Sequence, residues 1–395
     1  MEKSIPSAEE ERKLETPSSF TKSVFYQTAT NISLLFFNMV VSVITARWLG
    51  PYGKGVINTL GQFLTFLGLL LSPGLYASLM YHIAGRKFSL REGIATYTFF
   101  TLVYSLPLTF FVFIISPFLT HNILKGVPLQ ILFVSLIFSF IGLYFNPLSI
   151  TLYALQRFPQ IFYTNIICSL ANLLFLALFL IFLKMGILGA MLSQWFLVPL
   201  TILVNLYFLK DVLRFSFFKP IPKIGIMKNL LSYGWKVFLG NIFWQINLRA
   251  DVLIVNYFKS PSSVGLYTVG VSYTELLRLL PGAIGGVLFP RVSSLGEEEA
   301  LHLTCLVTRL LTLYILIFVP LLLFLAHFVI PFFFGTKFIS SISVVPYLMP
   351  GVVAWSYLSQ ISNYLSGRGH PEYHLYSTVL AAFVTLAGDF LLIPR

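Results

Sequence analysis

Charged side chains interrupt the long apolar stretches of the chain at seven positions, all of them in its second half. The basic residues are Lys236, Arg249, Arg278 and Arg309, and the acidic residues are Asp251, Glu275 and Asp389. An ionisable group inside a membrane-spanning helix costs at least ~2–3 kcal/mol on insertion scales, so each position requires a physical reason. Lys236 and Arg309 lie near the ends of their apolar runs, where long basic side chains reach the lipid headgroups. The candidates for binding or ion chemistry are therefore Arg249, Asp251, Glu275 and Arg278.

The positions of Arg249 and Glu275 predict an ion pair between two neighbouring helices. Arg249 lies eight residues before the end of the apolar run 230–257, and Glu275 lies ten residues into the run 265–290. At ~1.5 Å per residue, both lie at similar depths of ~12 and ~15 Å from the same side. Arg278 follows Glu275 at a spacing that places both side chains on one helix face. A guanidinium group can bind two phosphate oxygens at once, so this cluster suits a diphosphate. The alternative is an ion pair that only fixes helix packing.

Asp251 follows Arg249 by two residues, so we expect its side chain to lie on a different face of the same helix. One interpretation is that Asp251 titrates or binds a coupling cation, H⁺ or Na⁺, during a transport cycle. The other is that it completes a network of packing contacts. Asp251 and Glu275 are together the candidates for ion coupling or charge balance.

Polar residues form two further stripes that recur along the chain. The first stripe contains Gln27, Asn31, Asn38 and Ser42, and the second contains Asn241, Gln245 and Arg249. At ~100° per residue, the members of each stripe fall within a narrow arc of their helix. Such stripes often only hydrogen-bond neighbouring helices. Their recurrence on equivalent helices favours a shared, hydrated cavity that contacts sugar hydroxyls.

Motifs for covalent chemistry are not found in the sequence. It has no P-loop, no glycine-rich dinucleotide turn and no metal-ligand spacing, so we expect neither a cofactor nor a metal. Cys168 and Cys305 both fall inside apolar runs, which favours neither disulfide nor metal chemistry. A membrane glycosyltransferase or polysaccharide polymerase usually needs a large outer loop or an acidic catalytic cluster. The outer loops here are short, so we expect a protein that is not an enzyme.

The composition is that of an integral membrane protein. Hydrophobic residues make up 57% of the 395 positions and charged residues only 10%, against about a quarter charged in soluble domains. The formal net charge of +12 is spread between apolar runs rather than clustered, which indicates contact with anionic membrane lipids and not with nucleic acid.

Eleven apolar runs reach the ~20 residues that a membrane-spanning helix needs. They lie at roughly 24–46, 56–83, 93–115, 128–154, 161–183, 187–209, 230–257, 265–290, 304–328, 341–365 and 373–394. Of the basic residues outside these runs, leaving out Arg395 at the chain end, 15 fall on the N-terminal side and 6 on the other. By the positive-inside rule, this predicts a multi-pass protein of the cytoplasmic membrane with a cytoplasmic N-terminus.

An internal repeat divides the apolar runs into two parallel-related halves. Three short matches recur in order at offsets of 210, 208 and 211 residues: Pro51–Gly55 with Pro261–Gly265, Leu71–Gly74 with Leu279–Gly282, and Tyr153–Arg157 with Tyr364–Arg368. Parallel repeats of this kind are typical of transporters. We therefore predict a disordered cytoplasmic tail at 1–22, a six-helix lobe at 23–209, a cytoplasmic linker at 210–228 and a second lobe at 229–395. The second lobe lacks its last helix, either because the chain is a fragment or by nature, and a fragment is the favoured interpretation.

With these residues placed, the sequence resembles the polysaccharide transporter family of oligosaccharide flippases. That family belongs to a superfamily that also contains MATE-type multidrug extruders and the lipid II flippase. The resemblance extends from Phe20 to the end of the chain. Its residues are Ala46–Pro51 with Gly55, Arg249–Asp251, Gly265–Tyr267, Pro290–Arg291, Phe334–Gly335 and Leu392–Pro394. The missing twelfth helix and the absence of acidic residues inside the first six runs depart from the family pattern.

The resemblance implies an all-α bundle of two lobes facing each other across a central cavity. It also implies a polyprenyl-diphosphate-linked oligosaccharide as cargo, flipped by alternating access for cell-surface polysaccharide synthesis, and other polysaccharide assembly proteins as partners. In this hypothesis Arg249 and Arg278 attract the diphosphate. The principal alternative is an ion-coupled extruder of drugs or other small molecules on the same scaffold.

Overall fold

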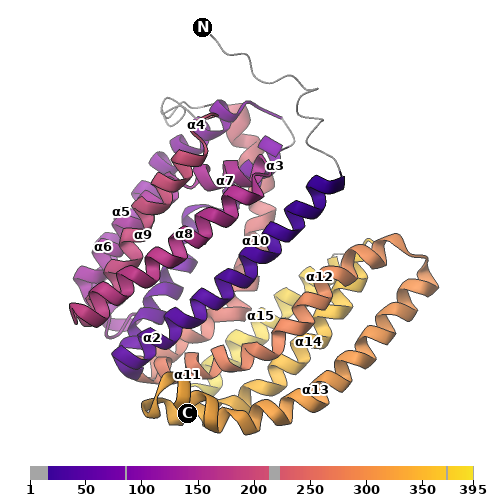
Figure 1. Ribbon diagram of the computed structural model, residues 1–395. Helices are drawn as coiled ribbons and strands as arrows, with labels where there is room; N and C mark the ends of the chain where they lie inside the picture. The colour runs from indigo at the N-terminus through magenta and orange to yellow at the C-terminus, as the bar shows by residue number, and fades with distance from the viewer. Residues whose placement is uncertain (1–16, 85–86, 213–222, 371, 395) are drawn as a thin grey trace. The chain divides into compact units, whose positions relative to one another are not determined.

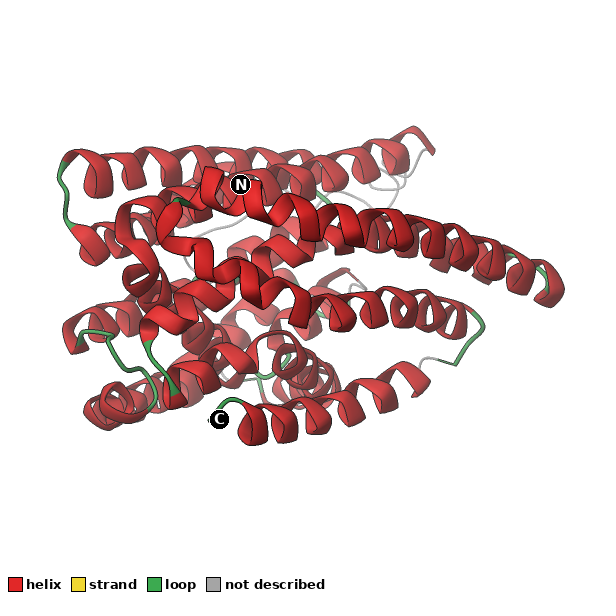
Figure 2. Cartoon of the chain, turned by 90° about the horizontal axis from the view of Figure 1, so that it is seen from below, coloured by secondary structure: helices red, strands yellow, loops and turns green. Residues whose placement is uncertain are grey.

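The structure is a computed structural model that describes residues 17–84, 87–212, 223–370 and 372–394, and every regular element within them is helical (Figures 1 and 2). Residues 1–16 of the predicted tail and 213–222 of the predicted linker lie outside the described residues. The predicted all-α class is thereby confirmed.

Along the chain, the helical elements of the described residues fall into two groups, before and after residues 213–222. The first group comprises α2 (Pro17–Leu71), α3 (Leu75–Ala84), α4 (Leu90–Phe100), the π-helical η1 (Thr101–Ser105), α5 (Leu106–Asn122), α6 (Leu129–Tyr144), α7 (Pro147–Ala154), α8 (Phe158–Leu176), the π-helical η2 (Ala177–Phe182) and α9 (Gly186–Phe208). The second comprises α10 (Ile224–Phe258), α11 (Pro261–Thr274), the 3₁₀ turn η4 (Glu275–Arg278), α12 (Leu279–Ser294), α13 (Glu297–Phe334), the 3₁₀ segment η5 (Thr336–Val344), α14 (Val345–Gly367) and α15 (Glu372–Leu392).

Eight of the helical stretches in the described part of the chain are long and apolar enough to cross a membrane. Helices suit this environment because they satisfy their own backbone hydrogen bonds where lipid offers no partner. The protein is therefore a multi-pass membrane protein. Neither α10 nor the stretch from α11 to α12 is among the eight, and these are the elements that carry Arg249, Asp251, Glu275 and Arg278.

The break predicted between the first two apolar runs is narrower than expected. α2 continues through the region and changes direction at a single residue, Gly50, whose φ of 66° and ψ of −173° are not helical. Glycine adopts this conformation without a Cβ penalty, and Pro51 then suits the first turn of the resumed helix. The second predicted run instead divides after Leu71, and a left-handed Gly74 (φ 67°) precedes α3.

The chain forms two compact units whose boundaries differ from those of the predicted lobes. Of the described residues, unit 1 contains those up to Ser42 together with those of 70–113 and 134–237, and unit 2 contains those of 43–69, those of 114–133 and those from Phe238 onward. In unit 1, α8 packs along α9 (Figure 1), and the core between α3 and α7 contains Leu75, Leu79, Tyr97, Ile150 and Leu230. In unit 2, α12 packs along α14 (Figure 1), and one core cluster is built from Tyr273, Leu277, Ala326, Phe334 and Phe338. The arrangement of lobes stays a prediction.

Candidate functional site

Two arginines of unit 2 share one carboxylate. Arg249 of α10 donates from Nη2 to Glu275 Oε1 at 2.8 Å, and Arg278 Nη1 lies 3.9 Å from the same oxygen. The predicted ion pair between neighbouring helices is therefore confirmed, and so is the placement of Glu275 and Arg278 on one face. The side chains are 28%, 33% and 20% exposed for Arg249, Glu275 and Arg278, so the cluster is sheltered yet accessible.

The local backbone explains why Glu275 and Arg278 lie together. Residues Glu275–Arg278 form the 3₁₀ turn η4 between α11 and α12. A 3₁₀ turn has three residues per turn, so side chains three apart eclipse each other. Leu279-Leu-Pro-Gly282 follows directly, and proline removes a backbone donor where the tighter turn returns to α-helix. The sequence predicted a regular α-helix at this point, whereas in the structure one turn of it is a 3₁₀ turn.

The guanidinium group of Arg278 lies over the aromatic ring of Trp355. Cζ of Arg278 lies 3.8 Å from the ring centroid of Trp355, which is half-buried in α14. At this separation the ring attracts the guanidinium through its quadrupole. A guanidinium stacked on its flat face keeps its N–H edge directed outward for carboxylate or phosphate. The sequence did not single out Trp355, because nothing in its spacing distinguishes it from other aromatic residues.

The charge of this cluster favours an anionic ligand. Two guanidinium groups and one carboxylate sum to 2 − 1 = +1. Glu275 occupies only part of the donor capacity, since each guanidinium carries five N–H groups. A diphosphate would offer more acceptor oxygens than Glu275 and could bridge both arginines.

Asp251 lies on a different face of α10, as predicted. Its Oδ2 accepts a hydrogen bond from the hydroxyl of Tyr267 in α11, and its Oδ1 accepts from the backbone N–H of Val252 at 2.7 Å. Asp389 of α15 is close enough to interact electrostatically with Asp251. One oxygen of Asp389, Oδ2, is buried and has no hydrogen-bond partner among the described residues.

Contacts one helical turn away hold α10 and α15 in register. Asn247 donates from Nδ2 to the carbonyl of Thr378 at 2.8 Å and accepts from Thr385 at 3.4 Å. Asp251 follows Asn247 by four residues, and Asp389 follows Thr385 by four, so the two carboxylates extend the same interface. The sequence identified Asp389 as an acidic residue in an apolar run but gave it no role. The described residues contain no group of three or more His, Cys, Asp or Glu side chains placed to hold a metal ion.

The polar stripes are present within separate units. In unit 1, Gln27 donates to Asn31 at 3.3 Å, and Asn38 is exposed. In unit 2, Gln245 donates to Gln62 of α2 at 3.3 Å, and Asn241 is exposed. A cavity common to both stripes remains a prediction.

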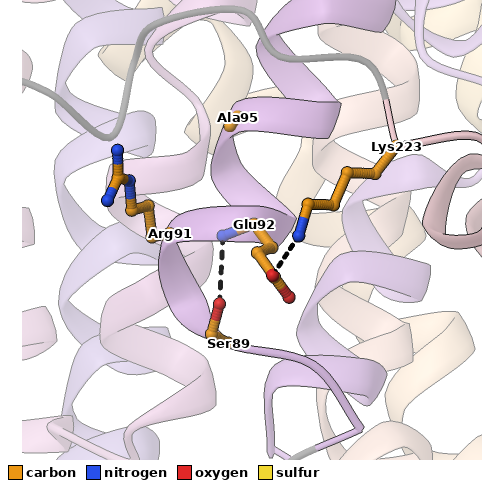
Figure 3. Close-up of a pocket in the computed structure, with 5 residues that line it drawn as sticks. All are labelled: Ser89, Arg91, Glu92, Ala95 and Lys223. Carbon is orange, nitrogen blue, oxygen red and sulfur yellow. Dashed lines mark hydrogen bonds and ion pairs between the residues drawn. The ribbon is translucent and has the colours of Figure 1, made fainter.

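A cavity of about 380 Å³ lies in unit 1, at the start of α4, and Figure 3 shows its lining. It is lined by Ser89, Arg91, Glu92, Ala95 and Lys223, none of which is a predicted site residue. Ser89 caps α4 by accepting from the backbone N–H of Glu92 at 3.3 Å, and Lys223 forms an ion pair with the Glu92 carboxylate. Ser89 therefore acts as a helix cap, and the ion pair between Lys223 and Glu92 anchors the chain just before α10.

A second ion pair of unit 1 lies outside the membrane-spanning segments. Arg157 binds both carboxylate oxygens of Asp211, at 2.9 and 2.5 Å, and donates to the carbonyl of Phe208 at 3.0 Å. The hydrogen bond and positive charge of Arg157 lower the pKa of Asp211. The stabilisation is therefore fully present above the ordinary aspartate pKa and is lost only as the pH falls through the lowered value.

The sequence matches a family model described as "Polysaccharide biosynthesis protein" over residues 20–295, well over half of the chain. Two curated relatives match shorter parts. An uncharacterized membrane protein of Methanocaldococcus jannaschii is 28% identical over 187 residues, which cover 46% of this chain and 37% of that protein. A probable flippase of Haloferax volcanii is 34% identical over 91 residues, which cover 23% of this chain and 18% of that protein. The chain thus spans well under two thirds of the length of either relative.

Two solved structures share the fold. An inward-facing MATE family multidrug resistance transporter of the MOP superfamily superposes with a TM-score of 0.72 at 18% identity, covering 89% of this chain and 84% of that one. An outward-facing structure of a MATE family transporter of the same superfamily gives 0.59 at 17% identity, covering 93% and 95%. The chain therefore belongs to the polysaccharide biosynthesis protein family, as a multi-pass membrane protein with the fold of MOP-superfamily transporters.

Proposed function

We propose that this protein flips a polyprenyl-diphosphate-linked oligosaccharide across the cytoplasmic membrane, by alternating access, for cell-surface polysaccharide synthesis. The observation that carries the proposal is the pair of arginines sharing Glu275 inside a member of the polysaccharide biosynthesis protein family. The Haloferax volcanii relative is a probable flippase, which supports the same class of activity. The N-terminus lies in the cytoplasm in this proposal.

Arg249 and Arg278 bind the diphosphate, and Glu275 balances their charge until the cargo arrives. Because Glu275 contacts both guanidinium groups, the diphosphate takes its place as their anionic partner, so neither arginine is left unpaired during the exchange. The sugar hydroxyls contact the polar stripes formed by Gln27, Asn31, Asn38, Asn241 and Gln245. The lipid tail stays in the bilayer, since moving it through a polar site would be costly.

Asp251 and its neighbour Asp389 provide ion coupling in this proposal. Two carboxylates in electrostatic contact, one with a buried oxygen that lacks a partner, favour uptake of H⁺ or Na⁺. The sequence has no ATP-binding motif, so the energy comes from an ion gradient, the membrane potential or the cargo gradient.

An extruder of drugs or other small molecules is the second candidate, because the two solved neighbours are MATE family multidrug resistance transporters. The two functions can use most of the same scaffold, so the chemistry of the ligand is what distinguishes them. An arginine cluster of net positive charge disfavours organic cations and favours anions.

A binding experiment on the purified protein separates the two candidates. Farnesyl diphosphate should bind, whereas farnesol and a lipophilic organic cation should not, as measured by isothermal titration calorimetry in detergent. Arg249→Ala should weaken diphosphate binding by about 10- to 100-fold, the loss of one charge-assisted contact, and Arg249→Lys should retain part of it. Binding of the organic cation with no binding of the diphosphate would favour the extruder.

A further inference from the structure

The first repeat match brings two equivalent helix starts into direct contact within unit 2. Pro51 opens the part of α2 that follows the kink at Gly50. Pro261 opens α11 after Ser260, whose side chain accepts from the N–H of Ser263 at 3.3 Å. The two prolines are 210 residues apart, and the glycine four residues after each, Gly55 or Gly265, repeats the same spacing.

Each glycine lies against the proline of the other repeat. A Cβ added to Gly55 would lie 1.6 Å from the carbonyl oxygen of Pro261, and a Cβ added to Gly265 would lie 1.9 Å from that of Pro51. Neither glycine has a positive φ, so the backbone would accept any L-residue. These glycines are therefore required for space: the two helices approach so closely that their backbones are in contact.

Side chains continue the same reciprocal pattern one turn further on. Asn58 donates from Nδ2 to Thr268 Oγ1 at 2.6 Å, and these residues are again 210 apart. Equivalent faces of equivalent helices thus cross each other, in an arrangement that we call the glycine crossing, formed by Pro51, Gly55, Asn58, Pro261, Gly265 and Thr268. It is held by van der Waals contact and a neutral hydrogen bond, which can separate without leaving a charge unpaired.

We propose that the glycine crossing is the outer gate of the transport pathway, closed in this structure and opened once in each cycle. It lies at the connections predicted to face the outer side of the membrane. The helix starts can swing because the chain bends just before both of them, at Gly50 and at the extended Ser260. This inference rests on the alternating access proposed above, and the alternative is a fixed pivot around which other parts move.

A reversible cross-link distinguishes a gate from a pivot. Asn58→Cys with Thr268→Cys, in a chain whose Cys168 and Cys305 are replaced by serine, should form a disulfide on oxidation. Flipping of a fluorescent polyprenyl-diphosphate oligosaccharide in proteoliposomes should then stop, and a reductant should restore it. The reduced protein is the control for folding. Continued flipping by the cross-linked protein would overturn the proposal.

A second measurement needs no cargo and therefore stands even if the proposed cargo is wrong. The reporter is Thr268→Cys, a buried position labelled from outside by a membrane-impermeant maleimide. Gly55→Ala should prevent the crossing from closing and raise the labelling rate about tenfold, as expected for an overpacked contact. Gly68→Ala in the same helix has open space around its Cβ and should leave the rate unchanged. Equal rates in both variants would contradict the gate.

Discussion

At the residue scale, the orientation of Arg278 depends on the ring beneath it. Trp355→Leu removes the cation–π contact, worth about 0.5–2 kcal/mol, and should weaken farnesyl diphosphate binding by about 2- to 30-fold. Trp355→Phe keeps an aromatic ring, so its affinity for farnesyl diphosphate should lie between those of the wild-type protein and Trp355→Leu. Trp244→Leu is the matched control, because the Trp244 ring lies near His374 rather than an arginine. Calorimetric titration measures the affinity of all three variants for farnesyl diphosphate. Equal affinities for Trp355→Leu and the wild-type protein would show that Trp355 does not contribute to the site.

Charged residues of the candidate site could be predicted from the sequence, and their uncharged supports could not. Arg249 and Glu275 stood out because a charge inside an apolar run is costly, and their depths alone predicted the ion pair that the structure contains. Trp355 is one of many aromatic residues in a chain that is 16% aromatic, so its type carries little information. The nearness of Asp389 to Asp251 depends on how α15 packs against α10, which no local pattern specifies.

At the element scale, the two glycines of the second repeat match, Gly74 and Gly282, differ in how closely other atoms pack against them. This difference gives a prediction in which one glycine is the control for the other. Gly74 has a positive φ of 67°, and a Cβ there would lie 1.9 Å from the carbonyl oxygen of Gly234. Its repeat counterpart, Gly282, has no heavy atom within 4 Å of the same position. Gly74→Ala should therefore destabilise the protein by about 1–3 kcal/mol through strain and overlap.

Thermal unfolding in detergent, followed by tryptophan fluorescence, measures this difference. Gly282→Ala should unfold at the wild-type temperature or slightly above it, because alanine favours the helix. If both variants unfold at the same temperature, the close approach of Gly74 to Gly234 does not contribute to stability.

Helix identity was predictable from the sequence, whereas helix interruptions were only partly so. Runs of apolar residues long enough to span a membrane identified the helical elements, because lipid leaves the backbone few alternatives. The kink at Gly50 is confined to one residue, although the sequence suggested a connection from 47 to 55. The 3₁₀ turn at Glu275–Arg278 has no sequence signature beyond the proline that follows it, and its contact with α14 is one that no local pattern predicts.

At the scale of the whole molecule, the two parallel-related halves remain a prediction from the repeat in the sequence. The compact units nevertheless combine segments from both predicted halves, since 43–69 and 114–133 pack with the chain from Phe238 onward. Sequence periodicity identifies related helices, but it carries no information about which of them remain in contact in a given state.

The central claim is that the protein moves a lipid-linked oligosaccharide and that Arg249 binds its diphosphate. Its most direct test is flipping of a fluorescent polyprenyl-diphosphate oligosaccharide in proteoliposomes, read as loss of fluorescence to an impermeant quencher. The wild-type protein should flip the cargo, Arg249→Ala should not, and Arg309→Ala, which changes an exposed arginine of α13, should flip normally. An inactive wild-type protein that is folded and correctly inserted, or an active Arg249→Ala variant, would contradict the account.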